Sequence, residues 1–196
     1  MNPSLELTPF LAPLAAVQRL LARFGDQGMI IGGVAASLLG KPRLTADVDA
    51  VILAPLAELP ELIAAAEQEG LVPRLGDAAE FARRHRVLLL RHPESGINVE
   101  LSLGMLPFEL KAVERSAIHQ IDGLALRLPA PEDLIVLKAV AHRPQDLLDI
   151  QALIEPNPNL DRARIEQWVR QFARALDMPG LWVDIAAWLQ PTDVSG

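Results

Sequence analysis

The chain has 196 residues, of which 51% are hydrophobic and 22% charged, and its 18 basic and 25 acidic side chains give a net charge of -7. This composition is typical of a globular domain with a sizeable core and argues against a disordered chain. Cysteine is absent, which excludes disulfides, thiolate metal sites and thiol nucleophiles and is compatible with a reducing cytoplasm. The acidic balance argues against nonspecific wrapping of a long nucleic acid but leaves a local basic groove open.

The N-terminal sequence has Glu6 where a secretory signal needs cations, and Pro9 and Pro13 interrupt it before an apolar run of the required length. The longest uncharged stretch, residues 27–40, is too short and too glycine-rich for a bilayer span of about 20 residues. We therefore expect no secretion, no membrane segment and a cytoplasmic location.

The first two thirds of the chain alternate between helix and strand patterns. Apolar residues at steps of three and four predict a helix over residues 9–24, followed by a strand at 29–31 and a helix at 34–39 that ends at Gly40. The next expected elements are a strand at 47–53, a helix at 58–70, a hairpin of strands 86–91 and 96–103, a helix at 107–115, and a hairpin of strands 117–121 and 124–128. Asp122-Gly123 is a strong type I′ turn signal in the second hairpin, where we expect the sheet to end.

From residue 131 onward the pattern is helical, with prolines as breaks. The expected helices cover residues 131–141, 145–154, 160–176 and 179–189, and residues 191–196 are expected to fray. The predicted fold is therefore an α/β fold with a small mixed β-sheet flanked by helices, plus a helical C-terminal part.

Asp47 and Asp49 stand at the start of a strand whose pattern suits burial on both faces. Residues two apart share one face of a strand, so both carboxylates point the same way. Two adjacent anions repel each other and burial adds to the cost, so we expect a positive group between them. Hard oxygen ligands of this kind suit Mg²⁺ or Mn²⁺. The alternative is a solvated strand end without a ligand.

Glu100 is the only acid in the strand at 97–103, and alternation places it on one face with Asn98 and Ser102. If this strand lies beside the strand of Asp47, the three carboxylates could hold two cations roughly 4 Å apart. That arrangement stabilises the attacking and leaving oxygens in phosphoryl or nucleotidyl transfer.

Gly32 and Gly33 precede Asp47 by a spacer of thirteen residues. A glycine pair lets the backbone approach a phosphate, and the helix that follows offers free N–H groups and the positive end of its dipole. The pair could also be a turn without a ligand. Together with the carboxylates, it favours a phosphate site joined to a metal site.

The order Ile31-Gly32-Gly33 followed by Asp47-Val48-Asp49 resembles the signature of the nucleotidyltransferase superfamily that shares the DNA polymerase beta fold. Within it, GGVAASLLGKPRLTADVD looks most like the AbiEii-type toxin nucleotidyltransferases and related small bacterial proteins. The later segment PEDLIVLKAVAHRPQDLLDI is similar to helices of the same group. Glu100 departs from the family, in which the third acid is more often Asp.

The resemblance implies that Asp47, Asp49 and Glu100 are catalytic acids that bind Mg²⁺ and that Gly32 and Gly33 hold the triphosphate. The further nucleotide-binding residues expected are Arg43, Thr45, Lys138, Arg143 and Asp146.

The residues of the later helices also have plainer interpretations. Lys138 is either a lysine at the edge of the core or a phosphate contact. Asp146 and Asp149 share one helix face that is either solvated or paired with Arg143, which could itself reach a phosphate.

The predicted enzyme consists of a catalytic core at residues 1–128 and a helical region at 129–196 that packs on the core and closes the nucleotide site. It would transfer a nucleoside monophosphate from an NTP to a hydroxyl with the help of Mg²⁺. The resemblance favours the 3′ end of tRNA, or another RNA, as the acceptor of a toxin with a partner antitoxin, while other superfamily members modify proteins or small molecules. The alternative is a nucleotide- or partner-binding module of the same fold without catalysis.

Five arginines between residues 74 and 92 outnumber the nearby acids Asp77 and Glu80. This stretch is either a solvated helix or an edge that receives an RNA acceptor. The arginines are Arg74, Arg83, Arg84, Arg86 and Arg91.

Overall fold

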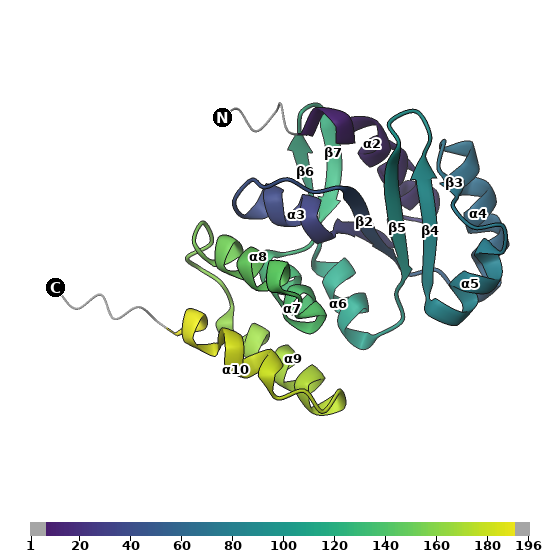
Figure 1. Ribbon diagram of the computed structural model, residues 1–196. Coiled ribbons are helices and arrows are strands. Elements are labelled where there is room, and N and C mark those ends of the chain that lie inside the picture. Colours follow the sequence, from purple (N-terminus) through teal and green to yellow (C-terminus); the bar gives the residue numbers. More distant parts are fainter. Residues whose placement is uncertain (1–6, 191–196) are drawn as a thin grey trace. The chain divides into compact units, whose positions relative to one another are not determined.

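The computed structural model describes residues 7–190, which divide into two compact units (Figure 1). Within the described residues, unit 1 contains the chain up to Ala35 together with Pro42–Ala130, and unit 2 contains Ala36–Lys41 and the chain from Pro131 onward. The expected fraying of residues 191–196 lies outside the described residues.

Unit 1 is built on a five-stranded mixed sheet with the strand order β1-β2-β5-β4-β3. Its strands are β1 (Gly28–Ile31), β2 (Asp47–Ile52), β3 (Val72–Pro73), β4 (Val87–His92) and β5 (Ile97–Leu103). β2 and β5 are parallel and every other neighbouring pair is antiparallel. Figure 1 shows β5 between β2 and β4, with helices beside the sheet. The predicted small mixed sheet flanked by helices is confirmed.

Most helices of unit 1 begin and end close to the predicted positions, but the helix at residues 78–85 was not among the expected elements and appeared only as one interpretation of the arginine-rich stretch, without bounds. The helices are η1 (Thr8–Phe10), α2 (Leu11–Arg23), α3 (Gly32–Leu39, which continues into unit 2), η2 (Leu56–Glu58), α4 (Leu59–Gln68), α5 (Ala78–His85) and α6 (Pro107–Arg115). α2 and α4 contact each other and the sheet. On one face of the sheet the alternating residues of the central strands are fully buried, namely Val48, Ala50, Val99, Leu101, Leu88 and Leu90. The core of unit 1 therefore lies on this face, and the opposite face can carry polar groups.

Two expectations about unit 1 are wrong in detail. The third helix begins at Gly32 rather than at residue 34, so the glycine pair forms its first turn. The second hairpin, β6 (Ala117–Ile121) and β7 (Leu124–Leu128), makes a separate two-stranded sheet instead of ending the main one. The backbone N–H of Arg127 in β7 donates to the side chain of Gln18 in α2 at 2.8 Å, so this outer amide does not join a strand ladder.

Unit 2 is helical, as predicted. Besides the end of α3, it contains α7 (Pro131–Ala141), α8 (Pro144–Ile154), α9 (Arg162–Ala175), α10 (Gly180–Ala186) and η3 (Ala187–Leu189). Pro131 and Pro144 occupy first helical positions, where the missing N–H of proline costs nothing. Among residues 7–190, no helix is both long enough and apolar enough to cross a bilayer.

Candidate functional site

The two strands at the centre of the sheet place three carboxylates on one face. The register pairs Asp47 with Asn98 and Asp49 with Glu100 across the parallel strands β2 and β5. Paired residues of neighbouring strands point to the same face. All three acids are partly exposed, whereas Val48 and Val99 on the opposite face are buried. The structure thus brings Asp47, Asp49 and Glu100 onto the face that faces away from the core.

Gly32 lies against one of these acids. β1 and β2 pair Ile31 with Asp49, so the residue after Ile31 turns past the carboxylate. A Cβ atom at position 32 would lie 1.8 Å from Oδ2 of Asp49, and Gly32 has φ +68°. Position 32 therefore requires glycine for two reasons: there is no room for a Cβ atom, and the backbone has a left-handed conformation. The first turn of α3 therefore lies directly beside Asp49.

The loop before β2 packs on the second glycine. A Cβ atom at Gly33 would lie 2.5 Å from Oγ1 of Thr45 and 3.0 Å from Nη2 of Arg43. Thr45 Oγ1 also donates to the carbonyl of Asp47 at 3.4 Å, and Arg43 Nη1 donates to the carbonyl of Leu44 at 2.8 Å. The structure thus brings a guanidinium, a hydroxyl and the first turn of a helix together beside the acids. These groups can all donate hydrogen bonds to an anion.

Sequence reasoning did not connect Arg74 with Glu100. Arg74 follows β3, and its backbone N–H donates to the carbonyl of Leu89 at 2.9 Å, which continues the pairing with β4. Its Nη1 lies 3.7 Å from Oε1 of Glu100. This contact could not be predicted because it depends on β3, a strand of only two residues. One of them is a proline, and the segment has no clear strand signal in the sequence.

Asp47 and Asp49 are the residues best suited to hold a divalent cation. Their carboxylates are hard oxygen donors on one face of β2, and neither is buried. Among residues 7–190, no group of three or more His, Cys, Asp or Glu side chains is arranged as a metal site. The side chain of Glu100, 46% exposed, instead pairs with Arg74. The donor chemistry therefore fits Mg²⁺ or Mn²⁺ at the two aspartates, and Glu100 would have to turn from Arg74 to join them.

Three of the predicted nucleotide-binding residues form an ion network within unit 2. Lys138 is only 4% exposed, and its Nζ lies 2.9 Å from Oδ1 of Asp146 and 2.8 Å from Oδ2 of Asp149. Arg143 Nε donates to Oδ2 of Asp146 at 2.7 Å. Asp146 and Asp149 are buried, so a solvated helix face is the wrong interpretation, and the alternative pairing with Arg143 is confirmed for Asp146.

The same contacts set the charge of Asp146. Burial acts to raise the pKa of this carboxyl, but hydrogen bonds from Arg143 and Lys138 outweigh burial and hold the pKa below its usual value. Its Oδ2 also accepts from the backbone N–H of Arg143 at 3.1 Å, at the start of α8. Asp146 is therefore an anion that joins α7 to α8.

A second buried ion pair in unit 2 was missed by sequence reasoning. Asp133 is fully buried in α7, and Arg164 of α9 donates to it from Nε at 2.8 Å. In the sequence, Asp133 looks like an ordinary acid in the first turn of a helix, where it would favour the helix dipole from the surface. Its partner lies 31 residues later, beyond the reach of any local pattern.

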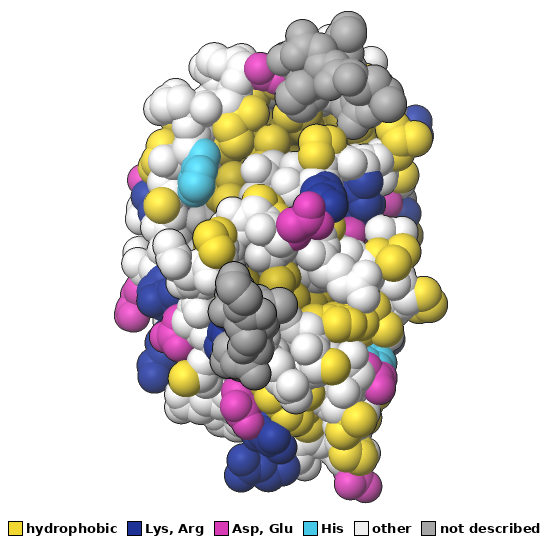
Figure 2. Space-filling model, turned by 90° about the vertical axis from the view of Figure 1, so that its left-hand side faces the viewer, with side chains coloured by type: hydrophobic (Ala, Val, Ile, Leu, Met, Phe, Trp, Pro, Cys, Tyr) yellow, Lys and Arg dark blue, Asp and Glu magenta, His cyan; other side chains and the backbone are white. Residues whose placement is uncertain are grey.

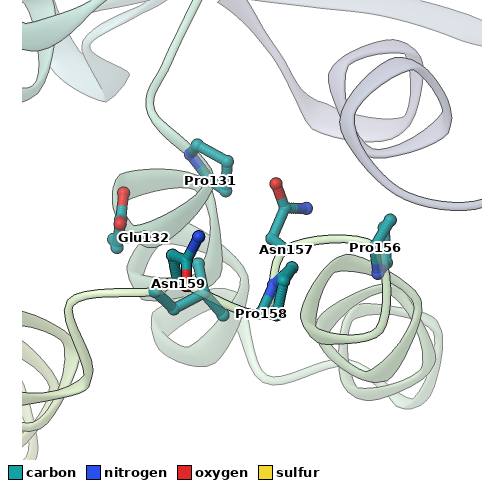
Figure 3. Close-up of a pocket in the computed structure, with 7 residues that line it drawn as sticks. Pro131, Glu132, Pro156, Asn157, Pro158 and Asn159 are labelled. Atoms are coloured by element: carbon teal, nitrogen blue, oxygen red, sulfur yellow. The ribbon is translucent and has the colours of Figure 1, made fainter.

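Unit 2 also contains a cavity of about 360 Å³ between the start of α7 and the connection from α8 to α9 (Figure 3). Its lining is Pro131, Glu132, Pro156, Asn157, Pro158, Asn159 and Leu160. None of the predicted site residues is among these. Asn157 donates to the carbonyls of Leu39 and Leu153 at 2.9 and 2.8 Å, and Glu132 accepts from the backbone N–H of Asp161 at 3.1 Å. These polar side chains therefore hold the surrounding backbone in place.

Comparisons with known proteins agree with this fold. One solved structure similar to the chain is the solution structure of the antibiotic-resistance factor ANT(2'')-Ia, with a TM-score of 0.55 and 15% sequence identity over 84% of this chain and 93% of that one. Another is a nucleotidyltransferase-like antigenic protein from Paracoccidioides brasiliensis, with a TM-score of 0.52 and 17% identity over 91% of each chain. At these identities the likeness shows the fold alone. No curated protein matches the chain.

Residues 14–154 match the family described as "Nucleotidyltransferase of unknown function (DUF6036)". The match covers most of the chain, including the glycine pair, the three acids of the sheet and the α7–α8 network. The resemblance to the nucleotidyltransferase superfamily is thereby confirmed, whereas the finer likeness to AbiEii-type toxins stays a prediction. The chain belongs to this nucleotidyltransferase family and is an enzyme that transfers phosphorus-containing groups.

Proposed function

We propose that unit 1 transfers a nucleoside monophosphate from an NTP to a hydroxyl of an acceptor and releases pyrophosphate. The acceptor oxygen forms a bond to the α-phosphorus while the bond from that phosphorus to the oxygen bridging to the β-phosphate breaks. The hydroxyl proton passes to a base or to solvent. The proposal depends on one observation above all, the close packing of Gly32 against Asp49, which puts the first turn of α3 beside a pair of carboxylates.

Each group of this site has a role in the proposal. The first-turn N–H groups of α3 would bind the triphosphate, aided by Arg43 and Thr45, which pack on Gly33. Asp47 and Asp49 would hold Mg²⁺ or Mn²⁺, and Glu100 is the third acid beside them. When bound, the metal neutralises charge on the triphosphate and lowers the pKa of the attacking hydroxyl.

The residues of unit 2 enter the proposal differently. Lys138 and Asp146 are candidates for nucleotide binding, but each already has a buried partner of opposite charge. The side chain of Arg143 is 72% exposed and pairs with Asp146 from the surface, so of the three residues it is best placed to contact a phosphate from solvent. The acceptor implied by the resemblance to AbiEii-type toxins is the 3′ end of tRNA, with an antitoxin as the corresponding protein partner.

The test is a labelling reaction with Mg²⁺ and each α-³²P-labelled NTP in turn. An extract that contains RNA, including tRNA, and protein would supply acceptors, and nuclease or protease treatment before electrophoresis would identify the class that carries label. Asp47→Asn and Asp49→Asn should each reduce labelling at least about a hundredfold, because both remove oxygen charge from the metal site. Asp77→Asn, an exposed acid before α5, is the matched control and should label like wild type.

The outcomes separate the possible activities. Label in nuclease-sensitive material that depends on Asp47 and Asp49 supports an RNA acceptor, and label in protease-sensitive material supports a protein acceptor. Label on neither, with no pyrophosphate released in the presence of small-molecule extracts, would contradict nucleotidyl transfer. NTP binding without any transfer would then favour the noncatalytic nucleotide-binding alternative.

A further inference from the structure

On the face of the main sheet that carries Asp47, Asp49 and Glu100, acidic and basic side chains lie on different strands. The register places Arg91 of β4 opposite Asn98 of β5, which is itself opposite Asp47 of β2. One row further along, Leu89 lies between Arg74 and Glu100, because β4 pairs Leu89 with Glu100 and the backbone of Arg74 bonds to Leu89. Acids therefore lie on β2 and β5, and arginines on β4 and just after β3.

This separation of charge is not seen on the side of the molecule that Figure 2 shows. There, Lys and Arg side chains lie among Asp and Glu side chains. The chain also has a net charge of -7, so a cationic region on its surface needs a reason. On the sheet face, the two arginines stand beside the carboxylates of the proposed transfer site.

Both arginines have hydrogen-bond donors to offer a ligand. Across residues 7–190, Arg91 is exposed and has no ion pair or side-chain hydrogen bond. The contact of Arg74 with Glu100 is 3.7 Å long, which is too long for a hydrogen bond, and both side chains are partly exposed. Exposed ion pairs of this kind are weak, so a multiply charged anion can replace Glu100 as the partner of Arg74.

The distance between the arginines and the acids suits a substrate that reacts beside the acids and binds to the arginines. Neighbouring strands are separated by about 4.8 Å, so Arg91 stands about 10 Å from Asp47 across the sheet. A hydroxyl near Asp47 and Asp49 and an anionic group on the same molecule could occupy both places at once. The guanidinium group matches phosphate oxygens with paired N–H donors, which makes phosphate the best-matched anion.

We propose that Arg74 and Arg91 bind phosphate groups of the acceptor, so that the enzyme acts on a phosphate-bearing hydroxyl compound. This inference rests on the proposed nucleotidyl transfer at Asp47 and Asp49 and adds the chemical class of the acceptor. A polycationic acceptor does not fit, because it would meet the two guanidinium groups.

Two probes distinguish the possible sources of the phosphate. A fluorescein-labelled octaribonucleotide, followed by fluorescence anisotropy, represents a chain of phosphates, and ribose 5-phosphate, followed by calorimetry, represents a small phosphate ester. Both are titrated at low salt into the whole protein with Mg²⁺ and a saturating α,β-methylene NTP analogue, so that the NTP site is filled. Arg74→Gln and Arg91→Gln should each weaken binding of the preferred probe about tenfold, the loss expected for one charge-assisted contact.

Arg83→Gln is the matched control, because the proposal assigns phosphate binding to Arg74 and Arg91 and not to the arginines of α5 in the same stretch of sequence. Arg83 is an exposed arginine of α5 without a partner among the residues described, and its replacement makes the same charge change away from the sheet face. The affinity of Arg83→Gln for the probe should stay within about twofold of the wild-type affinity, as expected for the loss of a distant charge. For the octaribonucleotide, each sheet-face variant should also reduce the slope of log K against log salt by about 0.7.

Several results would overturn the proposal. These are failure of wild type to bind either probe, an equal loss of affinity in Arg83→Gln, or binding of a probe only when the NTP analogue is left out, which would assign the arginines to the NTP. Asp47→Asn separates this question from the proposed function, since it should abolish transfer and leave probe binding intact. Probe binding without any transfer counts against the proposed function, and transfer that Arg74→Gln and Arg91→Gln leave unchanged counts against the acceptor site.

Discussion

Asp49 and Gly32 are in such close contact that a side chain at position 32 has no room: its Cβ would lie 1.8 Å from Oδ2 of the aspartate. The contact joins the start of α3 to the middle of the sheet face. It follows from the antiparallel pairing of β1 with β2, which sets Ile31 opposite Asp49.

Gly32→Ala should therefore impair both folding and activity. The left-handed backbone at φ +68° costs an alanine about 1 kcal/mol, and the clash with Asp49 adds to this. We expect the free energy of unfolding in urea to fall by at least about 2 kcal/mol and labelling to be lost. Gly76→Ala is the control, because a Cβ there meets open space. Equal stability of the two variants would contradict the packing of Gly32 on Asp49.

Glu100→Gln should separate activity from stability. The side chain is 46% exposed and its ion pair with Arg74 is long, so the free energy of unfolding should change by less than about 1 kcal/mol. If Glu100 is the third acid of the site, labelling should fall at least about tenfold. Glu94→Gln, an exposed acid in the turn after β4, should alter neither quantity. Wild-type labelling by Glu100→Gln would leave Asp47 and Asp49 as the only acids needed.

Lys138→Met should destabilise the protein by about 3 kcal/mol or more, because it leaves Asp146 and Asp149 buried without their shared cation. The double variant Lys138→Met/Asp149→Asn should recover part of this loss, since it also removes one buried anion. Lys111→Met, at an exposed lysine of α6, is the comparison for the same change at the surface, where solvent screens charge interactions. Urea unfolding measures all three. An unchanged stability in the single variant would show that Lys138 is free to serve a ligand.

Asp146→Asn should change how stability depends on pH. The pKa of Asp146 is lowered in the folded protein, so its charge stabilises the fold above the usual value of 3.8, and this contribution is lost as the pH falls through the lowered pKa. The stability difference between wild type and Asp146→Asn should therefore be largest near neutral pH and shrink below a pH of about 4. Free energies of unfolding of both proteins, determined at several pH values between 6 and 3, would measure this difference. A difference that is constant over this range would be the contrary result.

Local sequence patterns determined the positions of most elements and the identity of the candidate acids. Apolar periodicity predicted most of the helices but not α5, and both hairpins appeared at their turn signals, with Asp122 and Gly123 at positive φ of 48° and 82°. The spacing of Asp47 and Asp49 was enough to place them on one face, because alternation in a strand is a property of the backbone itself.

Only the tertiary structure decided which distant residues meet. The parallel register of β2 and β5 sets Glu100 opposite Asp49, and β3 brings Arg74 to Glu100. The pairs of Lys138 with Asp149 and of Asp133 with Arg164 likewise join separate helices of unit 2. No local pattern encodes such contacts, because strand register and helix packing are set by the burial of apolar faces over the whole unit, and the polar partners are brought together as a consequence.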